Sequence, residues 1–158
     1  MSPSAPGIGG VAALTLRWVI GGMFLYMGLA KALDPVAFLK LVHQYDLVRT
    51  PLLLNLIAAG LPWFEAFCGI LLVLGVAVRG TSLLLVAMLV PFTLVVLSHA
   101  QQLQAAGNLP FCAIKFDCGC GTGEVYVCRK LVENALLTAG CVLLLFRTRH
   151  ALMLWPRM

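Results

Sequence analysis

Four cysteines, Cys112, Cys118, Cys120 and Cys128, are grouped in one short stretch of the chain. A cluster of this density indicates redox chemistry, a metal site or a disulfide framework. Within it, the sequence Cys118-Gly119-Cys120-Gly121 separates two thiols by a single residue. Two cysteines so close together can form a small strained disulfide, and strained exposed disulfides are the labile, catalytic kind. We therefore predict that Cys118 and Cys120 are the catalytic pair.

The flanking cysteines, Cys112 and Cys128, allow two interpretations. They could be a second redox pair that relays electrons, or a structural disulfide that closes the loop. The less favoured alternative for the central pair is that one or both of its cysteines belong to a structural disulfide. Four thiolates could also hold zinc or an iron–sulfur cluster, although their spacing fits no standard motif and no loop histidine assists. We expect no metal, with a soft-metal site as the alternative.

Ionisable residues in apolar segments are the next candidates, because a charge inside a membrane span is costly and usually functional. Glu65 lies within such a segment, and Lys31, His99 and Arg129 lie at the ends of others. Lys31 and Arg129 could stabilise a thiolate, since nearby cations lower the pKa of a thiol. Glu65 or His99 could move the accompanying proton. The structural alternatives are an ion pair of Glu65 with Lys31 or Arg17, and an Arg129–Glu133 pair along one helix. If the second apolar segment bends at Pro62, Glu65 lies at the same depth as Lys31, and we predict that these two side chains interact near the loop-side surface.

The composition shows what kind of scaffold must position these residues. The chain has 158 residues, of which 61% are hydrophobic and 11% charged, with a mean hydropathy of +0.99 and a net charge of +5. Soluble globular proteins are typically about 45–50% apolar and about 25% charged. These values exclude a water-soluble enzyme, a disordered tail and a nucleic-acid-binding protein. We therefore expect the protein to lie in a lipid bilayer.

Four apolar segments have the length of a bilayer crossing, which needs roughly 20 residues. They span residues 11–33, 52–78, 81–100 and 127–146. Pro62 is expected to bend or break the second segment, so that its main span begins near Pro62. Val78–Gly80 is expected to form the next turn. Cys68 and Cys141 stand alone in apolar segments and are expected to be inert core thiols.

The predicted fold is an all-α membrane protein with a single domain, residues 1–158, built as a four-transmembrane-helix bundle. Between the first two spans, apolar and polar residues alternate from Phe38 to Gln44, which predicts one short interfacial helix. A long cysteine-rich loop joins the third and fourth spans. Loops of this length are usually functional or disordered.

Four crossings place both termini on one side of the membrane and the cysteine-rich loop on the other. The terminus side carries four arginines and no acidic residue, but the loop side also carries lysines and arginines, so the count of basic residues does not decide the orientation. The basic C-terminal tail favours cytoplasmic termini. The cysteine-rich loop would then be extracytoplasmic, where disulfides persist. We predict an integral protein of the bacterial inner (plasma) membrane.

Motifs along almost the whole chain resemble those of the MauE/DoxX family of small, redox-associated membrane proteins. They are Arg17, Gly21, Phe24, Gly28, Lys31, Asp34-Pro35 and Phe38, then Tyr45-Asp46-Leu47, then Pro62, Glu65 and Gly69, and finally Asp117-Cys118-Gly119-Cys120-Gly121. The DCGC stretch is typical of the MauE branch. Where the family often has Arg-Asn in its last helix, this chain has Glu133-Asn134.

The resemblance implies thiol–disulfide work at the membrane. MauE is associated with the maturation of methylamine dehydrogenase, whose small subunit is rich in disulfides. DoxD relatives pass electrons from sulfur compounds to quinone. The general plan is also similar to that of vitamin K epoxide reductase relatives, which bind a quinone at the cysteine end of four helices.

The leading hypothesis is a membrane thiol–disulfide oxidoreductase. Cys118 and Cys120 would exchange with a thioredoxin-like or cysteine-containing extracytoplasmic partner, and a quinone below them would accept or donate the electrons. One alternative is a non-enzymatic assembly or maturation subunit of a redox enzyme, whose loop disulfides shape a docking face. The other is a membrane protein that handles soft metals or sulfur species.

Overall fold

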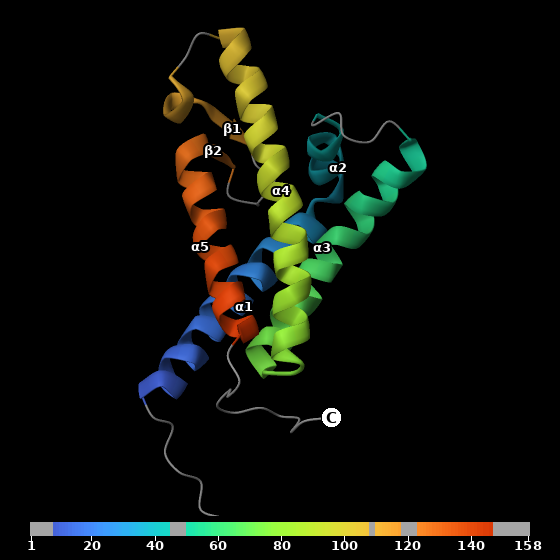
Figure 1. Ribbon diagram of the computed structural model, residues 1–158. Helices are drawn as coiled ribbons and strands as arrows, with labels where there is room; N and C mark the ends of the chain where they lie inside the picture. The colour runs from blue at the N-terminus through green and yellow to red at the C-terminus, as the bar shows by residue number, and fades with distance from the viewer. Residues whose placement is uncertain (1–7, 45–49, 108–109, 118–122, 147–158) are drawn as a thin grey trace, which may run out of the picture.

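The computed structural model describes residues 8–44, 50–107, 110–117 and 123–146, which form five helices and a small hairpin (Figure 1). The elements are α1 (Ile8–Leu33), α2 (Pro35–Gln44), α3 (Pro51–Leu74), α4 (Val78–Gly107), the 3₁₀ turn η1 (Phe111–Ala113), β1 (Lys115–Asp117), β2 (Glu124–Tyr126) and α5 (Val127–Phe146). The start of α1 and the end of α5 lie at one end of the bundle, and the hairpin lies at the other (Figure 1).

Three helices of the described chain are long and apolar enough to cross a membrane: Gly10–Leu33, Pro51–Leu74 and Val78–Gly107. Helix α5 has 20 residues, the length of a span, but Arg129, Lys130 and Glu133 occupy its first two turns. The apolar helices indicate a membrane protein. The fourth crossing stays a prediction.

The outward faces of the long helices are also apolar. Trp18 and Tyr26 on α1 and Leu56 on α3 are more than half exposed, as are Leu94 on α4 and Leu136 on α5. Soluble monomers rarely expose large contiguous apolar surfaces. We therefore interpret these faces as the surface that contacts lipid.

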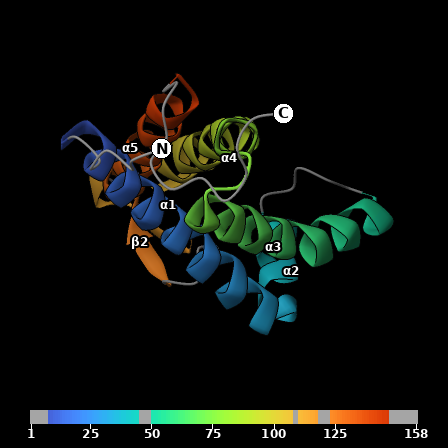
Figure 2. The same cartoon turned by 90° about the horizontal axis from the view of Figure 1, so that it is seen from below.

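Helices α1 and α3 pack against each other along much of their length, which Figure 2 shows from below. Small residues allow this approach, as they do between membrane helices in general. A Cβ atom on Gly28 would lie 2.6 Å from both the Ala66 nitrogen and the Pro62 oxygen, and one on Gly69 would lie 2.7 Å from the Gly21 oxygen. The two backbones are therefore nearly in contact.

This contact gives a first prediction, tested by a matched pair of glycines on α1. Gly28→Ala should destabilise the protein by about 1–3 kcal/mol or more, because the added methyl group meets backbone that cannot move without separating the helices. Gly22→Ala should be neutral or slightly stabilising, since nothing lies within 4 Å of that position. Thermal unfolding in detergent measures both, and equal stability of the two variants would contradict the close packing.

The second and third spans differ in detail from the expectation. Helix α3 runs unbroken through Pro62 from Pro51 to Leu74, and the turn lies at Gly75–Ala77 rather than at Val78–Gly80. Gly75 adopts the left-handed conformation (φ 77°), and its N–H and that of Val76 bond back to the last-turn carbonyls of α3. This is the usual way for a glycine to end a helix. Ala77 also has positive φ, at 45°.

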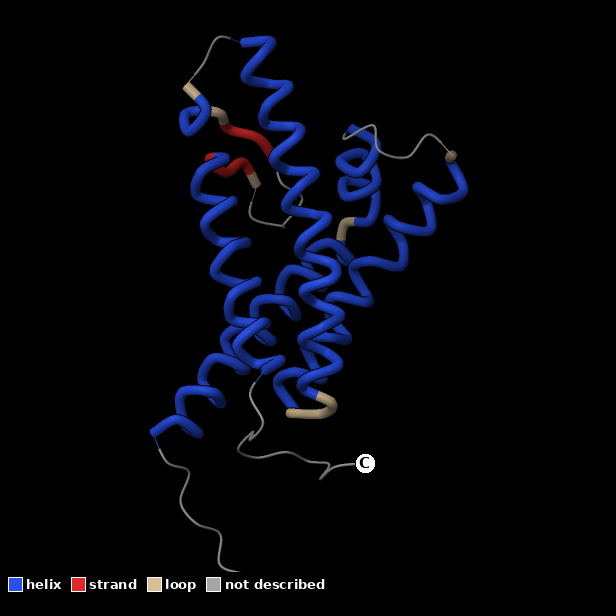
Figure 3. Tube along the Cα trace, in the orientation of Figure 1, coloured by secondary structure: helices blue, strands red, loops and turns tan. Residues whose placement is uncertain are grey.

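The segment predicted as a long loop is shorter than expected. Helix α4 extends seven residues beyond Ala100 to Gly107, because the Gln, Leu and Ala residues there are good helix formers. The remainder contains two short antiparallel strands, in which Lys115 pairs with Tyr126 and Asp117 with Glu124 (Figure 3). The all-α prediction is therefore wrong for this segment. The strands form a hairpin whose connection carries residues 118–123.

Candidate functional site

The centre of the site is a buried ion pair between α1 and α3. The Lys31 ammonium lies 2.7 Å and 2.6 Å from the two Glu65 carboxylate oxygens, and each side chain is 7% exposed. This confirms the predicted pairing of Lys31 with Glu65. Glu65 belongs to the buried stripe of α3, one turn from Pro62 and facing α1. The pair satisfies both charges where water is scarce.

The Asp34-Pro35 motif positions a third residue on this pair. An oxygen of the Asp34 side chain accepts a hydrogen bond from the backbone N–H of Ala37 at 3.0 Å, and Pro35 occupies the first position of α2. This is a typical helix N-terminus. Because α2 begins directly after α1, the centroid of the Phe38 ring lies 5.4 Å from the Lys31 nitrogen. The cation thus contacts an aromatic face as well as a carboxylate.

Helix α5 contributes a lysine that the sequence reasoning missed. Lys130 is 2% exposed, whereas the expected residue, Arg129, is exposed on the outside of the helix. Lys130 donates to Glu133 at 3.2 Å, so the predicted Arg129–Glu133 pair is replaced by a Lys130–Glu133 pair. Asn134, one turn on and 1% exposed, donates its amide N–H to the Thr93 hydroxyl at 3.2 Å.

A signal for Lys130 was present in the spacing of α5. Apart from Gly140, the buried residues of this helix recur at alternating intervals of three and four: Val127, Lys130, Asn134, Leu137, Cys141 and Leu144. This is the spacing of one helix face. When the spacing of the apolar buried residues is continued towards the start of the helix, it places Asn134 and Lys130 on the buried face. It places Arg129 on the exposed face.

An apolar cavity of about 340 Å³ lies between α1, α3, α4 and α5. Its polar lining consists of Lys31, Glu65, Lys130 and Asn134, all near the hairpin end of the bundle. The remaining wall is apolar and includes Phe24, Met27, Ile57, Leu61, Met88 and Phe92. Small-molecule sites typically have roughly this form, with volumes of about 300–1,000 Å³ and a few polar groups in an apolar wall.

A second pocket, of about 280 Å³, lies on the hairpin side of the ion pair. Its lining includes Asp34 at the start of α2 and the two residues at the ends of the hairpin connection, Asp117 and Gly123. Lys31 and Phe38 line this outer pocket and the inner cavity alike. These two side chains therefore form part of the wall between the two spaces.

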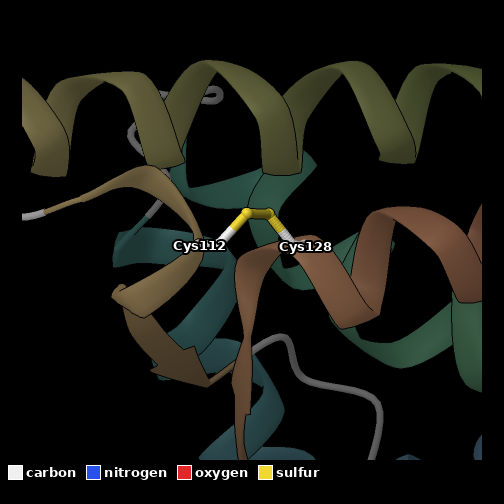
Figure 4. The surroundings of a disulfide bond; sticks show 2 residues. All are labelled: Cys112 and Cys128. Carbon is white, nitrogen blue, oxygen red and sulfur yellow. A yellow bond between two sulfur atoms is a disulfide. The ribbon is translucent and has the colours of Figure 1, made fainter.

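Cys112 and Cys128 form a disulfide that joins η1 to the first turn of α5 (Figure 4). Their Cα atoms are 5.0 Å apart, within the usual range for a disulfide. Cys112 and Cys128 were expected to be either a second redox pair or a structural disulfide, and the structure shows a disulfide that closes the hairpin segment. The bond also removes two of the four thiolates that a metal site would need. No group of three or more potential metal ligands occurs among the residues that the structure describes.

Removing this bond gives a second prediction. The double variant Cys112→Ala/Cys128→Ala should be less stable by about 3 kcal/mol, the value expected for closing a loop of about this length in the unfolded chain. Non-reducing thermal unfolding measures the loss. Dithiothreitol should lower the stability of the wild-type protein by a similar amount and leave the double variant unchanged. A wild-type protein insensitive to reduction would contradict a stabilising bond.

The other residues that the sequence singled out lie away from the inner cavity or outside the described residues. Cys118 and Cys120 lie outside the described residues, between Asp117 and Gly123. His99 does not line the inner cavity; its ring packs edge-on against Phe116 of β1, with ring centroids 6.3 Å apart. Cys68 and Cys141 are free and buried in the core, at 1% and 0% exposure, as expected of core thiols.

Comparison with known proteins identifies a single family. The family model described as "Methylamine utilisation protein MauE" matches residues 10–147. The matched range includes every residue that lines the inner cavity, together with the hairpin and the disulfide. No curated protein and no solved structure matches the chain.

Proposed function

The chain belongs to the MauE family, and from this premise we propose that it is a membrane thiol–disulfide oxidoreductase. Cys118 and Cys120 are the proposed redox pair, and the partner is a thioredoxin-like or cysteine-rich protein outside the cytoplasm. The description of the family model suggests that this partner serves methylamine utilisation. We propose that the protein acts in the maturation of a disulfide-rich enzyme subunit.

One observation carries this proposal. The two residues that flank the segment 118–122, Asp117 and Gly123, both line the outer pocket beside Lys31. Five residues of chain between these two points cannot extend far from them. The redox pair is therefore expected close to the Lys31–Glu65 pair, and the Lys31 ammonium is the proposed group that favours the thiolate that attacks a disulfide.

The proposed exchange conserves atoms and electrons. A partner thiolate attacks the Cys118–Cys120 disulfide, forming a mixed disulfide and releasing one thiolate of the pair. The second partner thiolate then attacks the mixed disulfide, so the partner leaves oxidised and both Cys118 and Cys120 are reduced. The net transfer is two electrons and two protons to the pair. The reverse sequence reduces the partner.

A quinone is the proposed redox partner of the cysteine pair, and the inner cavity fits its head. The cavity has an apolar wall and, at one end, the donors of Lys31, Lys130 and Asn134, which suit carbonyl oxygens. A bound quinone would supply an acceptor for two electrons and two protons. Lys130 and Asn134 would orient its oxygens, and the apolar wall would exclude water. Glu65, held by Lys31, is the proposed proton-carrying group in this wall.

The cysteine connectivity tests the proposal. Mass spectrometry of the purified protein, under oxidising and reducing conditions, should show Cys118 and Cys120 changing between disulfide and thiol. This change should require only a mild thiol reductant, and a soluble quinone should reverse it. A pair that stays reduced in the presence of the quinone, or a permanent bond from either cysteine to Cys112 or Cys128, would overturn the proposal.

The disulfide-closed hairpin also suits a second function, that of an assembly subunit with a rigid docking face. In that case Cys118 and Cys120 would have no redox role. Their replacement would then lower the amount of protein and its activity together, whereas a redox role predicts normal amounts of an inactive protein. Immunoblotting of membranes beside the activity assay separates the two functions.

The topology of the hairpin gives a third prediction. After mild reduction, a membrane-impermeant maleimide should label Cys118 or Cys120 on intact cells, because the hairpin lies opposite the arginine-bearing terminus end (Figure 1). Buried Cys68 and Cys141 serve as unlabelled internal controls in the folded protein. Labelling only after permeabilisation would place the hairpin in the cytoplasm and remove the oxidising environment that the proposal assumes.

A further inference from the structure

The inner cavity has two chemically different ends. Its polar groups are gathered near the hairpin end of the bundle, where α1 ends and α5 begins, whereas its apolar lining runs along α4, towards the middle of α1 and α5, and along α3 through Leu61 and Ile57. A ligand that matches both ends must carry hydrogen-bonding atoms at one end and hydrocarbon at the other. Such a molecule is an amphiphile that dissolves in the membrane.

The charges on the wall select the kind of polar head. Two cations, Lys31 and Lys130, and one anion, Glu65, line the cavity, whereas Glu133, the partner of Lys130, does not. Lys31 already contacts both oxygens of Glu65. Among the residues that the structure describes, Lys130 makes one hydrogen bond, to Glu133, and an ammonium group has three donors. The wall therefore offers hydrogen-bond donors to accepting oxygens, neutral or anionic.

Asn134 adds a second, independent indication. Its amide N–H is bonded to Thr93, and its side chain is 1% exposed, yet it lines the cavity next to Lys130. The carboxamide is thus held in one orientation by Thr93, whose hydroxyl in turn donates to the Leu89 carbonyl at 2.7 Å. Buried polar groups held in this way at a cavity wall commonly orient a ligand.

The route into the cavity follows from the arrangement of α3 and α4. These helices leave the turn at Gly75–Ala77 together and diverge towards the hairpin end (Figures 1 and 3). Leu61 on α3 and Met88 on α4, which line the cavity, are only partly buried. Leu56, on the exposed side of α3, belongs to the apolar faces that contact lipid. The half-buried residues Leu61 and Met88 therefore link the cavity wall to the lipid-facing surface, and this link is the basis for an entry from the bilayer.

We propose, on the basis of the function proposed above, that the cavity binds the acceptor-bearing head of a membrane-soluble amphiphile through Lys130 and Asn134, and that this ligand enters sideways from the bilayer between α3 and α4. A quinone and a fatty acid share this chemistry, with carbonyl or carboxylate oxygens on an apolar chain. The two sources differ in charge and in redox activity.

Equilibrium binding to the full chain in lipid nanodiscs tests the proposal, with tritiated decyl-ubiquinone and tritiated oleate as separate probes. At least one probe should bind saturably with one molecule per chain. Lys130→Met should weaken binding about tenfold or more, the effect expected from losing a hydrogen bond to a charged donor. Arg129→Met is the matched control, since that side chain lies outside on the same turn, and should change the affinity less than twofold.

Two further variants separate the polar contact from structural effects. Asn134→Leu should weaken binding severalfold, whereas Thr93→Val, which removes only the supporting hydroxyl, should have a smaller effect. Leu61→Trp should obstruct the opening and weaken binding about fivefold or more. Leu56→Trp, on the lipid-facing side of the same helix, should leave binding unchanged. Equal affinity in Lys130→Met and the wild-type protein, or in Leu61→Trp and Leu56→Trp, would overturn the proposal.

The outcomes also distinguish this inference from the function on which it rests. Quinone binding that survives Cys118→Ser supports the cavity as a site in its own right, and quinone binding without any thiol turnover would overturn only the oxidoreductase. Binding of oleate alone supports the amphiphile site and removes the quinone from the proposed function. Failure of both probes to bind the wild-type protein would overturn the inference, even if thiol exchange with a protein partner persists.

Discussion

Replacing Cys118 or Cys120 with serine is expected to abolish thiol–disulfide turnover while leaving the helical bundle folded. The physical reason is that the proposed chemistry needs both sulfurs of the pair, whereas the core is made by residues of the helices and strands, among them Phe24, Leu72 and Leu85. Activity should fall to background in quinone-coupled turnover. One of the two variants should also accumulate a mixed disulfide with oxidised partner, because its remaining thiolate attacks the partner's disulfide, releasing one partner thiolate, and no second cysteine of the pair is left to resolve the product.

Non-reducing electrophoresis beside the turnover assay checks this result. Cys68→Ala and Cys141→Ala are the matched controls, since both thiols are buried in the core and away from the hairpin. Both controls should retain most of the activity. Full turnover in both hairpin variants would exclude a redox role for the pair, and an equal loss in the core variants would indicate an effect on stability.

Breaking the Lys31–Glu65 ion pair is expected to have the largest effect on stability. Lys31→Met or Glu65→Leu alone should destabilise the protein by about 3–5 kcal/mol, because each leaves a charge buried without its partner. The double variant should recover most of this loss, since no unpaired charge remains. Lys40→Met on the exposed side of α2 is the control and should have little effect.

A double-mutant cycle, with unfolding in detergent followed by circular dichroism, measures the coupling between the two side chains. A double variant as unstable as the sum of the single variants would show that the pair is not coupled. The same variants also address function. If the double variant is stable but inactive in quinone-coupled turnover, the pair serves the site as well as the fold.

Much of the molecule is determined by local properties of the sequence. Long apolar segments with few charges can only be membrane helices, so α1, α3 and α4 follow from composition and length. The order Asp34-Pro35 predicts the start of a helix, and an acidic residue in the apolar segment around Glu65 predicts a buried partner. The pairing with Lys31 followed because both residues were placed at the same depth.

Errors in the sequence-based predictions occurred where rotation about a helix or local backbone conformation decided the result. Adjacent residues of a helix point about 100° apart, so Arg129 and Lys130 face opposite environments although both are basic and both begin α5. The turn after α3 depends on Gly75 adopting positive φ, which ends the helix earlier than the apolar pattern suggests. Hydrophobicity alone resolves neither feature.

The cavity and its connection to the hairpin were decided only by the tertiary structure. Lys31, Glu65, Lys130 and Asn134 come from three helices far apart in the chain, and no local rule brings their side chains to one wall. The bond between Cys112 and Cys128 likewise depends on the hairpin that brings η1 onto α5. Sequence patterns specify which faces are buried, but only the packing of these faces specifies which side chains meet.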